Sequence, residues 1–315
     1  MKIVVLDKNS IGEDTPLDGL SKIGKVDIYN ATAPHEISER ISDADVIVLN
    51  KVKITKEVID SASCLKLICV FATGYDNIDV AAARARGVGV CNVPGYSTDS
   101  VALFTVANVL ALYTHLREYN GYVVSGEYSS SGIPNKLTPV YHEISGKTWG
   151  IIGLGNIGRA VAKVAEALGA RVIANKRTPT NDYECVDIDT LCRESDIITI
   201  HCPLNDESRG IINQDRIALM KRDVVIVNEA RGAVVNEYDI AQAIKKGMIG
   251  AFGSDVYSSE PFTTDHPFYE IKGFCNVLFT PHAAWGSYEA RTRCINIICD
   301  NILSYISGEK KNRVD

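Results

Sequence analysis

The sequence of 315 residues lacks features that would place it in several other protein classes. Its most apolar segment, residues 101–113, is well short of the about 20 residues that a membrane-spanning helix needs. Residues 1–20 predict no signal peptide, because the short apolar run that ends at Leu6 meets Asp7 at once. The net charge is −6 and the charges are scattered, which argues against nucleic acid or an anionic membrane as a partner.

The nine cysteines lack the spacing of a metal or disulfide framework. No two of them form a C-x-x-C pair, and most lie in apolar runs that are typical of strands or helices. We therefore expect buried free thiols, a cytoplasmic location with its reducing conditions, and no bound metal. No internal repeat or low-complexity tract is present.

Short apolar runs alternate with helical patterns, which predicts parallel α/β layers. The strands expected in the first half are 2–7, 26–30, 45–50, 65–72 and 89–93, with helices such as 35–42, 55–63, 77–87 and 100–116. From residue 148 a second α/β unit is expected, with strands at 148–152, 171–175, 196–201, 223–228, 250–255 and 276–280 and a last helix within 286–307. Residues 121–147 are rich in Gly, Ser and Pro and predict a long irregular connection, which is usually functional or interfacial.

The most informative motif is Gly153-Leu154-Gly155-Asn156-Ile157-Gly158, which follows an apolar strand and opens a helical pattern. In a dinucleotide-binding G-x-G-x-x-G motif the first glycine permits a tight turn, the second lets the pyrophosphate approach and the third lets helix and strand pack closely. The amides at the helix start then bind the anion. A glycine-rich turn without a ligand is the ordinary alternative.

This motif lies in the middle of the chain, so the simplest arrangement is a nucleotide domain inserted into a domain that both termini build. We expect two doubly wound parallel-sheet domains of the α/β class. Residues 99–285 would form a Rossmann dinucleotide-binding domain, and residues 1–98 with 286–315 a flavodoxin-like substrate domain.

Three polar residues follow predicted strands of the nucleotide domain, where α/β active sites are built. They are Arg231, Glu260 and His282. Each alone could be a surface arginine, a solvated turn glutamate or a structural histidine, but together they suit hydride transfer to a 2-oxo acid. An arginine fork binds the carboxylate and polarises the carbonyl, a protonated histidine supplies the proton, and a glutamate favours the imidazolium.

The chain resembles the D-isomer-specific 2-hydroxy acid dehydrogenase family over nearly its whole length. Besides the glycine motif, the resemblance rests on the segments 72–79, 201–204, 228–232, 253–261 and 280–285. It implies that Arg231, Glu260 and His282 are catalytic and that the protein is a homodimer with the region 120–147 at the interface. It also implies backbone contacts from Thr73 and Gly74 to the substrate carboxylate, and Asp255 near the nicotinamide amide.

Within the family, the segments 50–51, 92–98 and 285–291 look like the glycerate dehydrogenase, or hydroxypyruvate reductase, branch. Lys51 and Trp285 are candidate substrate-binding residues, although a solvated lysine and a packing tryptophan are equally good explanations. Pyruvate or a bulkier 2-oxo acid is the alternative substrate. A dinucleotide-sensing, corepressor-like binding protein is the alternative of another class.

The sequence departs from the family pattern at two places, the first of which concerns the cofactor and the second the local charge balance. No acid follows the second nucleotide strand, where Asn175, Lys176 and Arg177 stand, so NADP(H) use is slightly favoured over NAD(H). Glu229 stands where a small or hydroxyl residue is expected. The candidate cofactor-binding residues are Gly153, Gly155, Asn156, Ile157, Gly158, Asn175, Lys176, Arg177, Cys202, Pro203, Glu229, Ala230 and Asp255.

Overall fold

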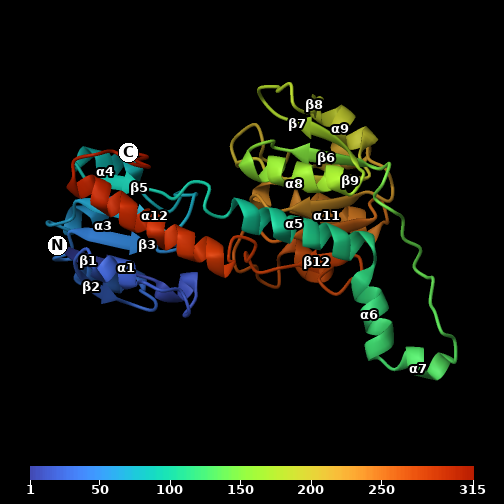
Figure 1. Cartoon of the computed structure of the whole chain (residues 1–315), viewed down its shortest axis with the longest axis horizontal. Coiled ribbons are helices and arrows are strands. Elements are labelled where there is room, and N and C mark those ends of the chain that lie inside the picture. Colours follow the sequence, from blue (N-terminus) through green and yellow to red (C-terminus); the bar gives the residue numbers. More distant parts are fainter. The chain divides into compact units, whose positions relative to one another are not determined.

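The computed structural model describes all residues from 1 to 315, and the chain divides into two compact units (Figure 1). The first unit contains Met1–Ser97 and Trp285–Asp315, and the second contains Thr98–Ala284. Both boundaries between the units lie one residue before the positions predicted from the sequence. The second unit is one continuous stretch of chain inserted into the first.

The first unit contains a five-stranded sheet in the order β2-β1-β3-β4-β5, with every pair of strands parallel. This is the strand order of flavodoxin-like folds, as expected. The strands are β1 (Lys2–Val5), β2 (Lys25–Ile28), β3 (Val46–Leu49), β4 (Leu67–Val70) and β5 (Gly89–Cys91).

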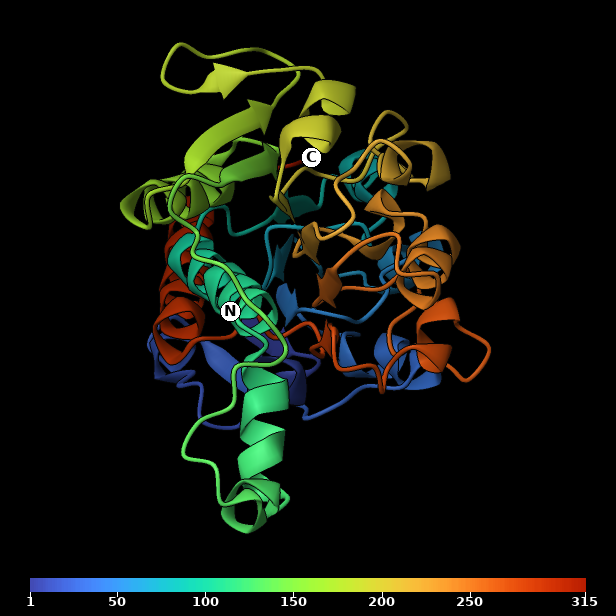
Figure 2. The same ribbon diagram turned by 90° about the vertical axis from the view of Figure 1, so that its right-hand side faces the viewer.

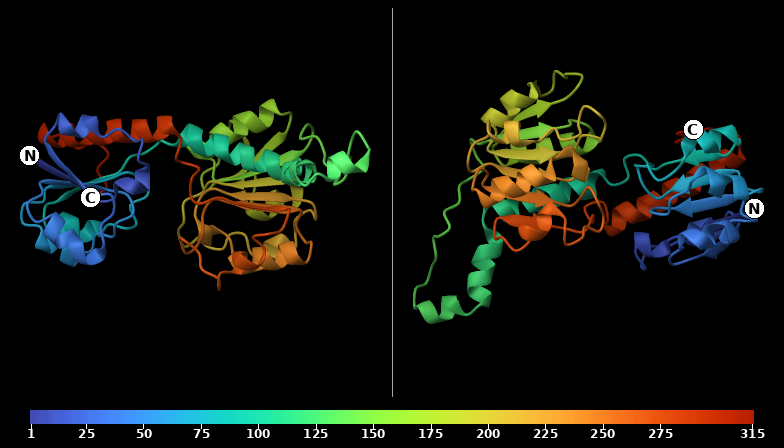
Figure 3. Two further views of the ribbon diagram at one scale, coloured as in Figure 1. Left: turned by 90° about the horizontal axis from the view of Figure 1, so that it is seen from below. Right: turned by 180° about the vertical axis from the view of Figure 1, so that it is seen from behind.

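Both faces of this sheet are covered, which explains why its central strands are continuously apolar. Val46 and Val48 of β3 pack toward α1 and α12, whereas Ile47 and Leu49 pack toward the helices of the other face. The two layers are visible in Figure 3, left. The elements are η1 (Lys8–Ile11), α1 (Asp18–Ser21) and α12 (Tyr288–Ile306) on one face, and η2 (Pro34–Glu36), α2 (Ile37–Arg40), α3 (Lys56–Ser61) and α4 (Val80–Ala85) on the other.

The second unit contains a seven-stranded, all-parallel sheet in the order β12-β11-β10-β9-β6-β7-β8. Starting from β6, the chain adds β7 and β8 on one side and then β9 to β12 on the other. The direction of strand addition therefore reverses between β6 and β9, as in a Rossmann fold. The strands are β6 (Thr148–Ile152), β7 (Arg171–Asn175), β8 (Glu184–Cys185), β9 (Ile197–Ile200), β10 (Val225–Asn228), β11 (Ala251–Ser254) and β12 (Val277–Phe279).

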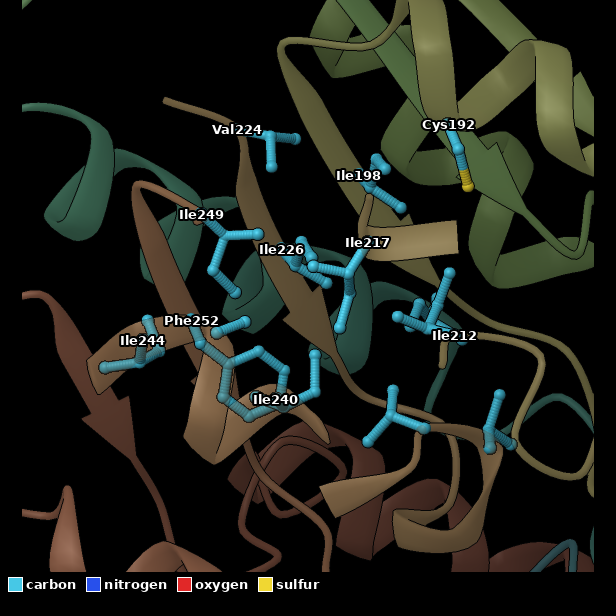
Figure 4. Close-up of a cluster of buried hydrophobic side chains, with 14 of the residues drawn as sticks. Cys192, Ile198, Ile212, Ile217, Val224, Ile226, Ile240, Ile244, Ile249 and Phe252 are labelled. Carbon is cyan, nitrogen blue, oxygen red and sulfur yellow. The ribbon is translucent and has the colours of Figure 1, made fainter. Parts of the chain in front are cut away.

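Two apolar clusters lie on the two faces of the second sheet. Helices α5 (Thr98–Tyr113) and α8 (Asn156–Ala167) cover one face. The other face, part of which is drawn in Figure 4, is packed with Ile and Phe side chains from the sheet and the opposing helices. The elements on that face are α9 (Ile188–Glu194), α10 (Gln214–Ile217), η3 (Gly232–Val234), α11 (Glu237–Lys245) and η4 (Pro267–Glu270).

The prediction of an irregular connection over residues 121–147 is wrong in its first part. Helix α6 (Leu116–Val124) and the short α7 (Glu127–Ser131) occupy that part, and the irregular connection is confined to a turn at 125–126 and to residues 132–147 (Figure 2). No single helix combines the length and apolarity of a membrane span, although α5 and α6 pass that test together, as a pair bent by 64°.

Candidate active site

The three predicted catalytic residues follow three neighbouring strands of the second unit. Arg231 comes after β10, Glu260 after β11 and His282 after β12. Because these strands are parallel and adjacent, their carboxyl ends lie at one edge of the sheet. The segments that follow β10 and β11 are in contact, since a Cβ added to Gly232 would lie 2.1 Å from the backbone nitrogen of Ser258.

The backbone around Arg231 is fixed by the last residue of β10. The Asn228 side chain donates to the Arg231 carbonyl oxygen at 3.0 Å and accepts from the Ala230 amide at 3.1 Å. The Arg231 guanidinium is partly exposed, and its Nη1 donates to the Ala230 carbonyl oxygen at 2.9 Å. The arginine therefore projects from a fixed turn and keeps other donors available for a ligand.

Glu260 and His282 form a close pair. The Glu260 Oε2 atom lies 2.6 Å from His282 Nδ1, and Glu260 Oε1 accepts from the Tyr257 amide at 3.0 Å. The two side chains are 30% and 26% exposed, so the pair is reachable from solvent. The carboxylate fixes the ring through Nδ1, which leaves Nε2 as the atom that can give a proton to a ligand.

The turn that carries His282 is organised by Asp255. His282 has a positive φ of 54°, which is uncommon for a residue with a side chain. Its amide donates to the Asp255 carbonyl oxygen at 2.8 Å. The buried Asp255 carboxylate accepts from the Ala283 amide at 2.8 Å, the Ala284 amide at 2.8 Å and the Thr280 hydroxyl at 2.6 Å.

The glycine turn has the geometry that a dinucleotide site requires. Gly153 has φ +94° and a Cβ there would meet the Cys202 backbone at 2.4 Å, so the turn excludes side chains. A Cβ on Gly158 would lie 2.3 Å from the Gly153 carbonyl oxygen, because α8 and β6 pack closely. A Cβ on Gly155 would meet nothing within 4 Å, which leaves its backbone open to a pyrophosphate at the start of α8.

The residues at the ribose end of the predicted site follow β7. The Asn175 side chain donates to the Val186 carbonyl oxygen at 3.1 Å, so its amide group is partly engaged by the neighbouring strand. Lys176 is partly exposed and Arg177 is exposed. On the other side of the glycine turn, burial raises the pKa of the Cys202 thiol to about 11. Pro203, the next residue, is exposed.

Two buried ionisable groups stand beside this turn and the β10 end. Glu229 Oε1 accepts from the Asn108 side chain of α5 at 2.7 Å, whereas its buried Oε2 has no hydrogen-bond partner. Burial, with the charge of Asp255 nearby, raises the pKa of Glu229 well above its ordinary value. Both ring nitrogens of His201 are also buried and unpartnered, and burial lowers the pKa of His201 to about 3. Burial therefore favours the neutral form of both groups.

The predicted substrate-binding residues Lys51, Thr73, Gly74 and Trp285 belong to the first unit. The Lys51 amide donates to buried Asp7 at 2.6 Å, and the Thr73 hydroxyl donates to the Val93 carbonyl oxygen at 2.9 Å. The Trp285 ring packs edge-on against Tyr96, with centroids 6.3 Å apart. Their roles toward a substrate, like the cofactor contacts of Glu229, Ala230 and Asp255, stay predictions.

Sequence reasoning missed a polar cluster that lies under the Glu260 segment. The Glu237 carboxylate contacts Ser258 and His266, although the three residues are far apart in the sequence and form no motif. Two surface depressions of the first unit, one beside Lys66 and one beside Arg40, contain none of the predicted site residues. No group of three or more His, Cys, Asp or Glu side chains is placed to hold a metal ion.

Comparison with known proteins identifies similar chains. Residues 106–284 match the family model described as D-isomer specific 2-hydroxyacid dehydrogenase, NAD binding domain. A hydroxypyruvate reductase of Blautia hydrogenotrophica is 36% identical over the full length of both chains. A glycerate dehydrogenase of Methylorubrum extorquens is 34% identical over 100% of this chain and 99% of its own. Among solved structures, an acyclic imino acid reductase in complex with NADPH and D-Arg has a TM-score of 0.86, with 31% identity and full coverage of both chains.

Proposed function

Because the chain belongs to the D-isomer-specific 2-hydroxyacid dehydrogenase family, we propose that this NAD(P)-dependent reductase of small 2-oxo acids acts on hydroxypyruvate or glyoxylate. The names of the two full-length relatives support hydroxypyruvate as the substrate. The observation that carries the chemistry is the pair of Glu260 and His282, 2.6 Å apart, at the same sheet edge as Arg231.

The three side chains have complementary tasks. Arg231 binds the substrate carboxylate through its planar fork and polarises the neighbouring carbonyl. His282, protonated on both ring nitrogens, gives the Nε2 proton to the carbonyl oxygen as negative charge develops there. The Glu260 carboxylate holds the ring through Nδ1 and favours the charged imidazolium before the transfer.

The cofactor would be held by the second unit. A bound reduced nicotinamide dinucleotide supplies the hydride. The open backbone face of Gly155 and the first amides of α8 would hold its pyrophosphate. The description of the family model names NAD and one structural relative is a complex with NADPH, so both cofactors are represented among similar proteins. The absence of an acid at position 175 supports a slight preference for NADP(H) in this chain.

Steady-state kinetics on a panel of 2-oxo acids tests the proposal. Hydroxypyruvate or glyoxylate should give the highest kcat/KM, above pyruvate and bulkier 2-oxo acids. His282→Ala should lower kcat about 10²–10⁴-fold with little change in cofactor affinity, since it removes the proton donor. Turnover of the variant close to that of the wild type would remove His282 from the mechanism.

Cofactor choice is tested by running the same assay with NADH and NADPH. Asn175→Asp should shift the preference toward NADH, because an acid repels a 2′-phosphate and accepts hydrogen bonds from a free 2′-hydroxyl. Neutralising Lys176 and Arg177 together should weaken NADPH use selectively. The difference in NADPH use between the wild type and the double variant should shrink at high salt, because exposed charges are screened over about 10 Å at 0.1 M. A strong wild-type preference for NADH that the double variant leaves unchanged would contradict this assignment.

We also propose that the protein is a homodimer that associates through α6, α7 and the following segment. That region exposes large apolar side chains that a monomer would leave in water. They are Leu116, Val123, Val124, Ile133, Leu137, Val140 and Tyr141, each at least 53% exposed.

A further inference from the structure

Glu237 is a buried carboxylate in the first turn of α11, and it is 8% exposed. Its Oε1 accepts from the Ser258 amide at 2.8 Å, and its Oε2 accepts from both the Ser258 hydroxyl and His266 Nε2, the latter at 2.9 Å. A buried carboxylate is tolerated only when its oxygens are hydrogen-bonded, and here three donors converge on it. Glu237, Ser258 and His266 are called the Glu237 cluster below.

The hydrogen bonds of His266 determine which nitrogen carries its proton. The Phe268 amide donates to His266 Nδ1 at 3.2 Å, so Nδ1 acts as an acceptor. Nε2 must therefore carry the hydrogen that points at Glu237. The ring is also held by aromatic neighbours, with Phe262 stacked on it at 5.0 Å between centroids and Phe268 edge-on at 5.2 Å. The His266 ring thus has a single orientation, in which Nε2 donates to Glu237.

The Glu237 cluster is hydrogen-bonded to the backbone segment that carries Glu260. Ser258, which donates two of the three hydrogen bonds to Glu237, is two residues before Glu260. The same segment supplies the Tyr257 amide that binds Glu260 Oε1 at 3.0 Å. The segment also meets Gly232, which immediately follows Arg231. One buried carboxylate therefore ties the start of α11 to the turn that carries Glu260.

We infer that Glu237 and His266 are positioning residues that hold Glu260 against His282 through the backbone of Ser258. This inference rests on the proposed function, since Glu260 matters for turnover only if His282 is the proton donor. Neither residue touches the substrate. When the hydrogen bonds between Glu237 and Ser258 are lost, the turn that carries Glu260 moves. The distance between Glu260 and His282 then increases, and the imidazolium loses the stabilising charge of the carboxylate.

The test compares Glu237→Gln with a matched control in the same helix. The glutamine keeps the shape and can still accept from the Ser258 amide, but its NH₂ group faces two donors, the Ser258 hydroxyl and His266 Nε2. Its kcat should fall about 10–100-fold with cofactor affinity retained, because small misplacements at an active site have effects of this size. The pH at which turnover declines on the alkaline side should also move lower.

Ile244→Ala is the control, because Ile244 is a buried core residue of α11 with no place in the cluster. It should lower the unfolding temperature but leave the pH profile in place. His266→Phe keeps a ring and loses the donor, so it should resemble Glu237→Gln. His266→Gln keeps a donor and should recover part of the activity. If Glu237→Gln does not fold, Ser258→Ala, which removes the hydroxyl alone, gives the same comparison with a smaller expected effect.

A readout that needs no substrate separates this inference from the proposed function. In histidine-labelled protein, the ring signals of His282 should move in Glu237→Gln and stay at their wild-type positions in Ile244→Ala, because only the first variant disturbs the contact of Glu260 with His282. Unchanged His282 ring signals in Glu237→Gln would overturn the positioning role. Absence of wild-type turnover on every 2-oxo acid would instead overturn the proposed function, and the ring signals would still decide the role of the cluster.

Discussion

At the scale of single residues, the buried carboxyl of Glu229 in the second unit carries an electrostatic cost. Its Oε2 is buried without a partner, and its pKa is raised by burial and by Asp255. A carboxyl with a raised pKa in the folded state stabilises the fold at low pH. That stability is lost as the pH rises above the ordinary carboxyl range, because the unfolded chain then gives up its proton more easily.

Glu229→Gln should therefore stabilise the protein at neutral and alkaline pH. The amide has the same shape, needs no proton to be neutral, and can still accept from Asn108. We expect a gain of roughly 1–3 kcal/mol in the free energy of unfolding at pH 8, and a smaller gain at pH 4. Denaturant unfolding at the two pH values measures it, and an equal effect at both would contradict a raised pKa of Glu229 in the folded protein.

Arg231→Lys tests the carboxylate fork. Lysine keeps the charge but not the planar pair of donors, so substrate binding and carbonyl polarisation should both weaken. A loss of roughly 1.5–3 kcal/mol corresponds to about one to two decades in kcat/KM. Cofactor affinity, measured by direct titration, should stay within about two-fold. An unchanged kcat/KM would exclude the fork.

At the scale of elements, the glycine turn allows a prediction with its own control. Gly155→Ala adds a methyl that meets no protein atom within 4 Å, so the unfolding temperature should hardly change while cofactor affinity falls about ten-fold or more. Gly158→Ala places a methyl 2.3 Å from the Gly153 carbonyl oxygen and should cost about 1–3 kcal/mol of stability. Normal cofactor binding by Gly155→Ala would show that no pyrophosphate approaches there.

The elements that the sequence predicted well are those with a strong local signal. Strands β6 and β7 have their predicted bounds because a buried parallel strand is a continuous apolar run. The sequence did not predict the two-residue β8 or the helices α6 and α7. None of the three buries an apolar face, so none shows a clear hydrophobic periodicity in the sequence. Helix α4 starts later than predicted because the Asp79 side chain caps it by accepting from the Ala82 amide at 2.9 Å.

The candidate site also contains residues that the sequence could predict and residues that it could not. The glycine turn and the residues that follow strands were predictable because topology brings strand ends together. The Glu237 cluster was not, because hydrogen bonds between positions 21 and 29 residues apart depend on how α11 packs. The buried state of Glu229 depends on Asn108, 121 residues away, and has no local signal either.

At the scale of the whole molecule, the apolar surface of α6, α7 and the following segment should control association. Leu137→Asp combined with Val140→Asp places charges on side chains that are 75% and 67% exposed. Because both positions face solvent in the single chain, the fold should survive while a dimer dissociates. Sedimentation velocity should give a dimer for the wild type and a monomer for the variant. A monomeric wild type would contradict the proposed assembly.

The insertion of one unit into the other has a consequence for the way in which the chain unfolds. Within the second unit, the Ser100 hydroxyl near its start donates to the carbonyl oxygen of its last residue, Ala284, at 2.6 Å. Within the first unit, Tyr96 and Trp285, on either side of the gap, have ring centroids 6.3 Å apart. Each unit thus keeps its own chain ends together at the point of insertion, so we expect the two units to unfold as separate cooperative bodies.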